Sequence, residues 1–459
     1  MDVEILARVQ FALTIMFHYI YPPLSIGLGL MLVIMEGRYL WTRDPIWLQM
    51  AKFWTKVFAL TFAIGVATGI VMEFEFGTNW ATYSRYVGDV FGSALAAEGV
   101  FAFFLESGFL ALLLFGWNRI SPPLHFFSTL MVCLGAHFSA IWIIVANSWM
   151  QTPAGYHIVG SGLAARAEIT NFWQMVFNPS SVDRLVHAVI GSWLAGAFLV
   201  VSVSAFYLLK KKHENFAQKG LKVGLAVAFA ATLLQAVSGD SSARGVAVNQ
   251  PVKLAAFEGV YQTQDGASLT LFGIPNAKEK RLDYAIGIPK LLSFLSFRDF
   301  NARIQGLDSV PVSDQPNVSA VFTTYRMMLS MWTMMFFVTT LAVIQWFRGR
   351  LLTSKWTLRF CVLSVIFPQI ANQAGWVSAE MGRYPWIVQG LLRVSEGLSR
   401  SVTANQVLGS LIMFGCIYFI LFILFLYLLN EKIQHGPADT DRESPYHVLQ
   451  DYVEEITHE

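Results

Sequence analysis

The sequence predicts an all-α integral membrane protein whose transmembrane helices form one bundle. Of its 459 residues, 55% are hydrophobic and only 14% are charged, whereas a soluble globular chain carries roughly 25% charged residues. Apolar runs of about 20 residues, the length of helix that crosses the bilayer core, fill most of the chain. Lysine and arginine gather between some of these runs, as in the cytoplasmic loops of membrane proteins.

Nine apolar runs are long enough to span a membrane. They lie at about 9–35, 53–72, 94–116, 124–146, 187–209, 219–240, 327–347, 356–376 and 404–429. The first run is longer than the core of a signal peptide, and no small-residue cleavage site follows it. We therefore expect it to be a retained spanning helix.

The positive charges predict the orientation of the bundle. They cluster between runs one and two (Arg38, Arg43, Lys52, Lys56), five and six (Lys210, Lys211, Lys212, Lys219) and seven and eight (Arg348, Arg350, Lys355). These loops are expected in the cytoplasm. With nine spans, the N-terminus then lies outside and the C-terminus lies in the cytoplasm.

This orientation divides the chain into four segments. Residues 1–240 would form helices one to six and carry cofactor ligands, and residues 327–430 would form helices seven to nine. Residues 241–326 would form a long extracytoplasmic loop rich in Gly, Pro, Asp and Gln, which is the best candidate for a functional loop. Residues 431–459 would form a cytoplasmic polar tail.

Charge and cysteine content exclude several functions. A formal net charge of +2 gives no reason to expect nucleic acid as a partner. Cys133, Cys361 and Cys416 all lie in apolar runs without metal-ligand spacing, so they indicate neither a disulfide framework nor a thiolate metal site. A metal in this protein must use other ligands.

Ionisable residues inside the apolar runs are the first functional candidates, because each costs about 2.5–3.5 kcal/mol at a helix centre. His18, Glu98, Glu106 and Glu380 meet this criterion, and His187 and Met328 stand at the outer starts of two spans. All except Glu106 are expected near the outer membrane level. Histidine, methionine and carboxylate side chains can ligate haem iron, so the pattern suggests a bundle that holds several haems.

Structural roles remain open for each of these residues. A buried histidine often makes only a structural hydrogen bond, and Met328 is one of 16 methionines. His125, His137, His157 and His213 show no convergent partners in the sequence, so we interpret them as structural.

Glu106 follows Glu98 by eight residues. In a regular α-helix this spacing gives an offset of about 12 Å along the axis and about 80° around it. Such an offset suits a proton path from the cytoplasm, which Ser107 and Lys56 would extend. A glutamate hydrogen-bonded to a neighbouring helix is the alternative.

Several motifs resemble those of subunit I of cytochrome bd quinol oxidases. The most specific is A-G-W-V-S-A-E-M-G-R-Y-P-W at 374–386, which resembles the family's G-R-Q-P-W signature. Residues 239–259 read G-D-S-S-A-R-G-V-A-V-N-Q-P-V-K-L-A-A-F-E-G and resemble the opening of its quinol-binding Q-loop, of the short class. Further matches are R-x-Q-F-A…F-H at 8–18, A-E-G…F-F-L-E-S at 97–107, F-N-P…V-H at 177–187 and Y-R-M-M at 325–328. The resemblance covers essentially the whole chain.

The resemblance implies a role for each candidate residue. His187 and Met328 would be axial ligands of a low-spin haem b, and His18, Glu98 and Glu380 would be ligands or close neighbours of two high-spin haems, one b and the other d or a further b. Trp376 would lie among the porphyrins, and Arg383 and Arg326 would neutralise haem propionates. Lys253 and Glu258 would act in quinol oxidation, while Glu106, Ser107 and Lys56 match the family's proposed proton route.

The activity implied is that of a terminal oxidase in the bacterial cytoplasmic membrane. It would oxidise quinol at the outer face and reduce dioxygen to water with cytoplasmic protons, building a proton motive force without pumping. Subunit II would be its partner, and small single-helix subunits are further candidates. Two departures stand out: Tyr384 replaces the Gln of the signature, and Asn118 stands where some members carry Asp.

Two other functions fit the bare sequence pattern. A cytochrome b-type electron conduit would need only six-coordinate haems. A proton-coupled transporter would use the buried glutamates and histidines as ligands, but the internal repeats typical of such proteins are not evident.

Overall fold

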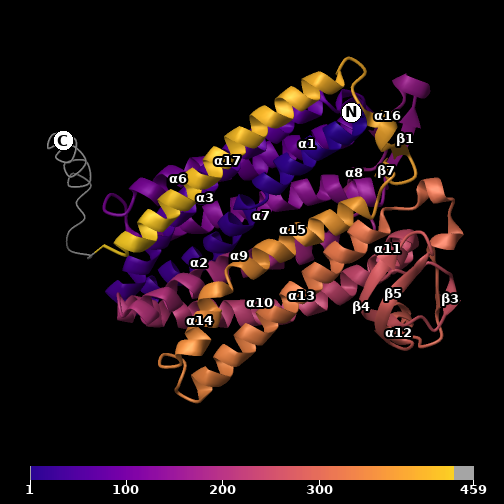
Figure 1. Cartoon of the computed structure of the whole chain (residues 1–459). Coiled ribbons are helices and arrows are strands. Elements are labelled where there is room, and N and C mark those ends of the chain that lie inside the picture. Colours follow the sequence, from indigo (N-terminus) through magenta and orange to yellow (C-terminus); the bar gives the residue numbers. More distant parts are fainter. Residues whose placement is uncertain (1, 439–459) are drawn as a thin grey trace.

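The computed structural model describes residues 2–438 of the chain. Within them, nine helical segments are long and apolar enough to cross a membrane. Figure 1 shows these segments running roughly alongside one another in one bundle. The expectation of nine spanning helices in a single all-α bundle is therefore confirmed. Most of the predicted polar tail, residues 439–459, lies outside the described residues.

The nine spans are built from the longer helices. They are α1 (Val3–His18) with α2 (Tyr21–Thr42), α3 (Pro45–Thr78), α5 (Gly88–Glu98) with the π-helix η1 (Gly99–Phe103) and α6 (Phe104–Phe115), α7 (Pro122–Gln151), α9 (Ser181–Lys210), α10 (Glu214–Asn249), α13 (Val318–Phe347), α14 (Lys355–Leu363) with α15 (Ile366–Met381), and α17 (Ala404–His435).

Shorter elements connect the spans. The helices are α4 (Ala81–Tyr86), α8 (Phe172–Val176), α11 (Pro251–Glu258), α12 (Leu291–Phe297) and α16 (Val394–Gly397), and the 3₁₀ turns are η2 (Gly162–Ala164), η3 (Leu307–Ser309) and η4 (Val312–Asp314). Four antiparallel strand pairs complete the described chain: β1 (Tyr156–Val159) with β2 (Arg166–Ile169), β3 (Gln264–Asp265) with β6 (Arg303–Ile304), β4 (Leu269–Asn276) with β5 (Arg281–Ile288), and β7 (Trp386–Val388) with β8 (Leu392–Arg393).

The first span is interrupted directly after His18. Helix α1 ends there, and α2 starts at Tyr21 with Pro22 and Pro23 in its first turn. A proline has no backbone N–H to donate four residues back, so these prolines leave the carbonyls of His18 and Tyr19 without helix partners. The break places the His18 side chain at a helix end inside the bundle.

The third span is not a regular α-helix. Residues Gly99–Phe103 form a π-helix between α5, which ends at Glu98, and α6, which contains Glu106. The wider π turn inserts an extra residue and changes the angular register of everything that follows. The expected offset between Glu98 and Glu106 assumed an uninterrupted α-helix, so that part of the prediction was wrong.

The sixth span continues beyond its apolar part. Hydropathy placed its end at about 240, yet α10 runs to Asn249. The polar residues of the last turns find partners there: Ser241 Oγ donates to Asp183 Oδ1 at 2.8 Å, and Arg244 pairs with Asp240 at 3.2 Å. The predicted outer loop therefore begins inside a helix, and its irregular part starts at Gln250.

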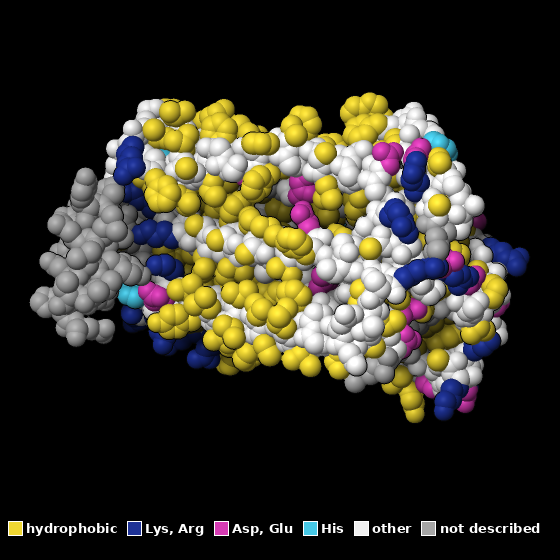
Figure 2. Space-filling view, turned by 90° about the horizontal axis from the view of Figure 1, so that it is seen from above, with side chains coloured by type: hydrophobic (Ala, Val, Ile, Leu, Met, Phe, Trp, Pro, Cys, Tyr) yellow, Lys and Arg dark blue, Asp and Glu magenta, His cyan; other side chains and the backbone are white. Residues whose placement is uncertain are grey.

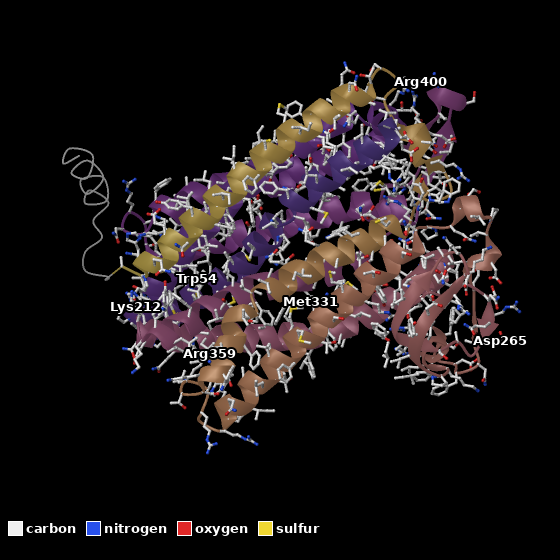
Figure 3. The ribbon with its side chains drawn as sticks, in the orientation of Figure 1. Trp54, Lys212, Asp265, Met331, Arg359 and Arg400 are labelled. Atoms are coloured by element: carbon white, nitrogen blue, oxygen red, sulfur yellow. The ribbon has the colours of Figure 1, made fainter. Side chains whose placement is uncertain are left out.

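The remainder of the long loop is a folded unit at one end of the bundle. Helices α11 and α12 and the strand pairs β3–β6 and β4–β5 enclose a small apolar core of their own. Figure 3 shows Asp265 of this unit and Lys212 of the short α9–α10 turn at opposite ends of the molecule. The lysine-rich turn and the long loop thus lie on opposite sides of the apolar bundle.

The surface follows the same division. In Figure 2 hydrophobic side chains cover the length of the visible helices, whereas lysine and arginine gather towards the two ends. The spans formed by α17 and by α5–α6 are the least buried inside the chain, at 11% and 17% of their most apolar stretches. These helices therefore offer most of their apolar surface to lipid or to another subunit.

Candidate functional site

His18 and His187 are held in the same way. The Nδ1 atom of His18 lies 3.0 Å from Thr68 Oγ1, and that of His187 lies 3.0 Å from Ser238 Oγ. Both hydroxyls already donate to backbone carbonyls, so each can accept the Nδ1 hydrogen. This arrangement turns Nε2 of each ring away from the hydroxyl, as in a histidine that binds metal. The Gln235 amide nitrogen lies 3.1 Å from His187 Nε2, so this amide must move aside before that nitrogen can bind iron.

His137 lacks such a free nitrogen. Its Nδ1 lies 2.7 Å from the carbonyl oxygen of Cys133, and Trp193 donates its indole hydrogen to His137 Nε2 at 2.9 Å. Both ring nitrogens are thus used within the protein. This geometry supports the structural interpretation of His137.

Met328 and His187 stand on α13 and α9, which both pack against α15. A Cβ atom added at Gly375 of α15 would lie 2.9 Å from Met328 Sδ. Any larger residue at position 375 would therefore push the Met328 thioether out of its present place. One turn earlier on α15, Asn372 donates to the backbone oxygen of Gly191, one turn after His187, at 3.4 Å. Helix α15 thus packs against both helices that carry the predicted ligands of the low-spin haem.

Glu380 is the centre of a charged cluster at the end of α7. It accepts hydrogen bonds from Asn147 and Gln151 at 3.1 Å each, and from Arg383 at 2.5 Å. Arg184 lies 3.7 Å from the same carboxylate and donates to Asn147 at 2.6 Å. Side chains of α7, of α9 and of the residues that follow α15 therefore converge on one carboxylate.

Trp376 connects this cluster to His18. Its ring meets the ring of Tyr19, the neighbour of His18, edge-on at 5.4 Å. The guanidinium of Arg184 lies 5.7 Å from the centre of the Trp376 ring. His18 and Glu380 thus share one neighbourhood through a chain of contacts.

The two glutamates of the third span both face α7. Glu98 accepts a hydrogen bond of 2.5 Å from Ser139. Glu106 is buried, and its side chain lies against Gly135, where a Cβ would collide with it. Ser107 and Lys56 are exposed on the surface of this chain, so the structure does not bring them into the buried seam beside Glu106.

Lys253 is fully buried between the loop and the bundle. Its ammonium donates to Gln250 at 2.8 Å and also to Gln151, and its side chain packs on Gly382 of the signature motif. Burial holds the pKa of Lys253 well below its ordinary value of 10.5, assisted by the positive charges of Arg184 and Arg383 and opposed by Glu380. The lysine is therefore prepared to exchange a proton more readily than a free one.

Glu258 lies at the other end of α11, directly before Gly259, whose left-handed conformation ends that helix. It forms an ion pair with Arg326, which stands two residues before Met328 on α13. Burial raises the pKa of Glu258 above its ordinary value of 4.5, and Arg326 acts in the opposite direction. Lys253 and Glu258 have different partners, so the structure does not join them directly.

The residues present fit haem groups. All six predicted contact residues (His18, Glu98, His187, Met328, Trp376 and Glu380) are half-buried, so each keeps accessible surface. Arg184 Nε, Arg326 Nε and Arg383 Nη1 are buried without a hydrogen-bond partner. Buried unpaired donors are costly, and carboxylates such as haem propionates would satisfy them.

A bare metal ion has no comparable site. Across residues 2–438, no three His, Cys, Asp or Glu side chains gather in a way that could hold one. Haem iron needs at most two protein ligands, so this finding agrees with the fit to haem.

Comparison with known proteins decides the family. A family model described as "Cytochrome bd terminal oxidase subunit I" matches residues 6–437. The chain belongs to the cytochrome bd terminal oxidase subunit I family. The resemblance drawn from the sequence motifs is thereby confirmed.

Curated members of the family match over nearly the full length. Cytochrome bd ubiquinol oxidase subunit 1 of Bacillus subtilis is 37% identical over 99% of this chain and 98% of its own length. Cytochrome bd-II ubiquinol oxidase subunit 1 of Escherichia coli is 34% identical over 97% and 99%. The solved bd oxidase of Geobacillus thermodenitrificans matches with a TM-score of 0.88 and 28% identity, covering 95% of this chain and 99% of that one.

The cytochrome bd fold brings in polar residues that the sequence did not single out. Arg184, Asn147 and Gln151 complete the surroundings of Glu380, and Arg184 stands one turn before His187, which was the available signal. His125, interpreted from the sequence as having no convergent partner, lies 2.6 Å from Glu36. That interpretation was wrong because Glu36 falls one residue beyond the predicted end of the first span.

Proposed function

We propose that this chain is the haem-carrying subunit of a quinol oxidase that oxidises quinol at the outer face and reduces dioxygen to water with cytoplasmic protons. The observation that carries the proposal is the cluster around Glu380. Three cationic side chains, Arg184, Arg383 and Lys253, surround a single carboxylate there, and two of the guanidinium groups keep unpaired donors. Bound anionic groups next to His187, His18 and Met328 explain this excess of charge.

The haem sites follow from this arrangement. His187 and Met328 would hold a low-spin haem b, while His18, Glu98 and Glu380 would serve two high-spin haems, one b and one d or b. Haem iron bound there would supply one-electron chemistry and an open position for dioxygen. Arg326 and Arg383 would hold propionates, and Trp376 would lie between the porphyrins.

Quinol binding is assigned to the loop unit. Glu258 would accept a proton from the quinol hydroxyl, since burial raises its pKa and so makes the carboxylate a stronger base than a free one. Lys253, with its lowered pKa, would orient the quinol oxygen. Both residues sit next to arginines of the haem cluster, so substrate would be oxidised close to the electron acceptor.

Protons would come from the other side of the membrane. Glu106 is buried against α7 and would pass protons towards Glu98, with Lys56 and Ser107 at the surface of the same path. Quinol protons released outside and water protons taken from inside separate charge without a pump. The positive charges of the short turns support this orientation, with the N-terminus outside.

The membrane partner is subunit II of the same oxidase. The weakly buried apolar faces of α5–α6 and α17 give it room, and small single-helix subunits would fit on the remaining surface. The location would be the bacterial cytoplasmic membrane.

A reduced minus oxidised optical spectrum of the purified complex, repeated with carbon monoxide, tests the proposal. We expect low-spin b bands together with a high-spin band that shifts with the gas. Low-spin bands alone, unmoved by carbon monoxide, would leave only an electron conduit. Protein without any Soret absorption would return the transporter to consideration.

A further inference from the structure

Glu36 and His125 form a buried pair far from the Glu380 cluster. Each is 2% exposed, and His125 Nδ1 lies 2.6 Å from Glu36 Oε1. His125 stands in the first turn of α7, whereas Asn147, which binds Glu380, stands near its end. The two residues are 22 positions apart, which is roughly 33 Å of helix.

The hydrogen bonds show how many protons the pair holds. His125 Nε2 lies 3.1 Å from the backbone oxygen of Leu113, and a carbonyl only accepts, so Nε2 carries a hydrogen. A second hydrogen must lie between Nδ1 and Oε1, because two acceptors would repel at 2.6 Å. Thr129 donates to Glu36 Oε2 at 2.5 Å. The pair is therefore neutral overall and holds one shared proton.

The end of α6 fixes the orientation of the His125 ring. Helix α6 ends at Phe115, so the carbonyl of Leu113 is among the last four, which have no partner within the helix. This carbonyl therefore accepts the Nε2 hydrogen of His125 and fixes the orientation of the ring, with Nδ1 towards Glu36.

The pair is aligned with Glu106. Helix α6 buries only two side chains, those of Glu106 and Leu113. They are seven positions apart, which is two turns and roughly 10 Å along the same face. This face meets α7, where Gly135 contacts Glu106 and His125 contacts the Leu113 carbonyl. Glu106 and the pair are therefore two protonatable sites along one helix seam.

The other side of the pair faces the end of the molecule. The half-buried ring of Trp117 covers His125, with ring centres 3.8 Å apart, and the following turn is exposed. One aromatic ring thus separates the pair from the surface that the positive charges assign to the cytoplasm.

We propose that the Glu36–His125 pair is the proton-loading site that supplies Glu106 from the cytoplasm. The pair gives its shared proton towards Glu106 and is left as neutral imidazole with carboxylate. A proton from cytoplasmic water then restores it. This role rests on the proposed function, and it provides an intake where Asn118 offers no carboxylate.

The test uses the complete two-subunit oxidase in vesicles, with a pH-sensitive dye on the cytoplasmic side. Glu36→Gln and His125→Gln should slow proton uptake after oxygen is added by at least about tenfold, since acid–base groups contribute about 10²- to 10⁴-fold. Haem spectra and the transfer of the first electron from quinol should stay as in the parent enzyme. Ser128→Ala is the matched control, because Ser128 is buried beside the pair but bonds only its own helix backbone.

A double variant guards against misfolding. Removing one partner of a buried pair is destabilising, whereas replacing both by apolar residues is often neutral or stabilising. Glu36→Met with His125→Leu should therefore fold and still take up protons about tenfold slower. Uptake at the parent rate in this variant would overturn the proposal. Parent enzyme that consumes no oxygen with quinol would instead refute the proposed function.

Discussion

The two ends of α7 carry opposite kinds of polar site. At one end Arg184, Arg383 and Lys253 surround Glu380, and buried guanidinium donors remain unpaired. At the other end Glu36 meets His125, and hydrogen bonds account for both carboxylate oxygens and both ring nitrogens. The first site has more positive charge than its own residues neutralise, whereas the second is complete. Incomplete electrostatic balance inside a membrane therefore indicates where a charged ligand belongs.

The largest effect is expected from removing an iron ligand at the incomplete end. His187→Ala should abolish the low-spin haem band and lower quinol oxidation at least about 100-fold, because no neighbouring residue offers the same nitrogen. The reduced minus oxidised spectrum and oxygen consumption measure both effects. His157→Ala, in the exposed β1 strand, is the control and should behave as the parent. Retention of all haem bands in His187→Ala would contradict the ligand assignment.

Replacing Lys253 tests whether the Glu380 cluster carries an excess of positive charge. Lys253→Met should lower quinol turnover by at least about tenfold and yet stabilise the haem-free protein, because burial and the neighbouring guanidinium groups disfavour the charged ammonium. The folded pKa of this lysine is depressed, so its destabilising effect is full below that pKa and vanishes as pH rises to 10.5. Thermal unfolding at several pH values should show a gain that shrinks with rising pH. Lys290→Met, an exposed lysine of the same loop, should show none.

A smaller change is expected at the quinol side of the cluster. Burial raises the pKa of Glu258 and Arg326 lowers it, so Arg326→Gln should raise it further. The carboxylate is the active form, so a higher pKa should move the acidic limb of the pH profile to higher pH. At alkaline pH the rate should change by no more than about threefold. The pH profile of quinol oxidation measures this shift. An acid limb that moves downward would rule out Glu258 as the base.

The smallest effect is expected at Tyr384, which replaces the Gln of the family signature. The guanidinium of Arg8 lies 4.1 Å from the centre of the Tyr384 ring. Tyr384→Gln should lose this contact, which is worth about 0.5–1 kcal/mol at exposed sites and about 2 kcal/mol when desolvated, and should change activity less than about twofold. Unfolding temperature and oxygen consumption together test it. A large loss of activity would show that the tyrosine has a role in the cluster.

The sequence predicted the spans and the proposed ligands better than their surroundings. His18, His187 and Glu380 were visible because an ionisable residue in an apolar run is conspicuous on its own. Arg184 and Gln151 were not, because each is an ordinary polar residue near a helix end until α7, α9 and α15 are packed together. Glu36 was missed because the helix continues beyond the apolar stretch that marked its span.

Local sequence determined which segments cross the membrane, because each helix satisfies its own backbone and needs only about 20 apolar residues to do so. It also determined the break after His18, since Pro22 and Pro23 cannot continue the helix. Only the tertiary structure decided which polar groups meet. Glu36 and His125 are 89 positions apart, and Gln151 and Glu380 are 229 apart. No pattern within one helix specifies such partners, because their contacts depend on how separate helices pack.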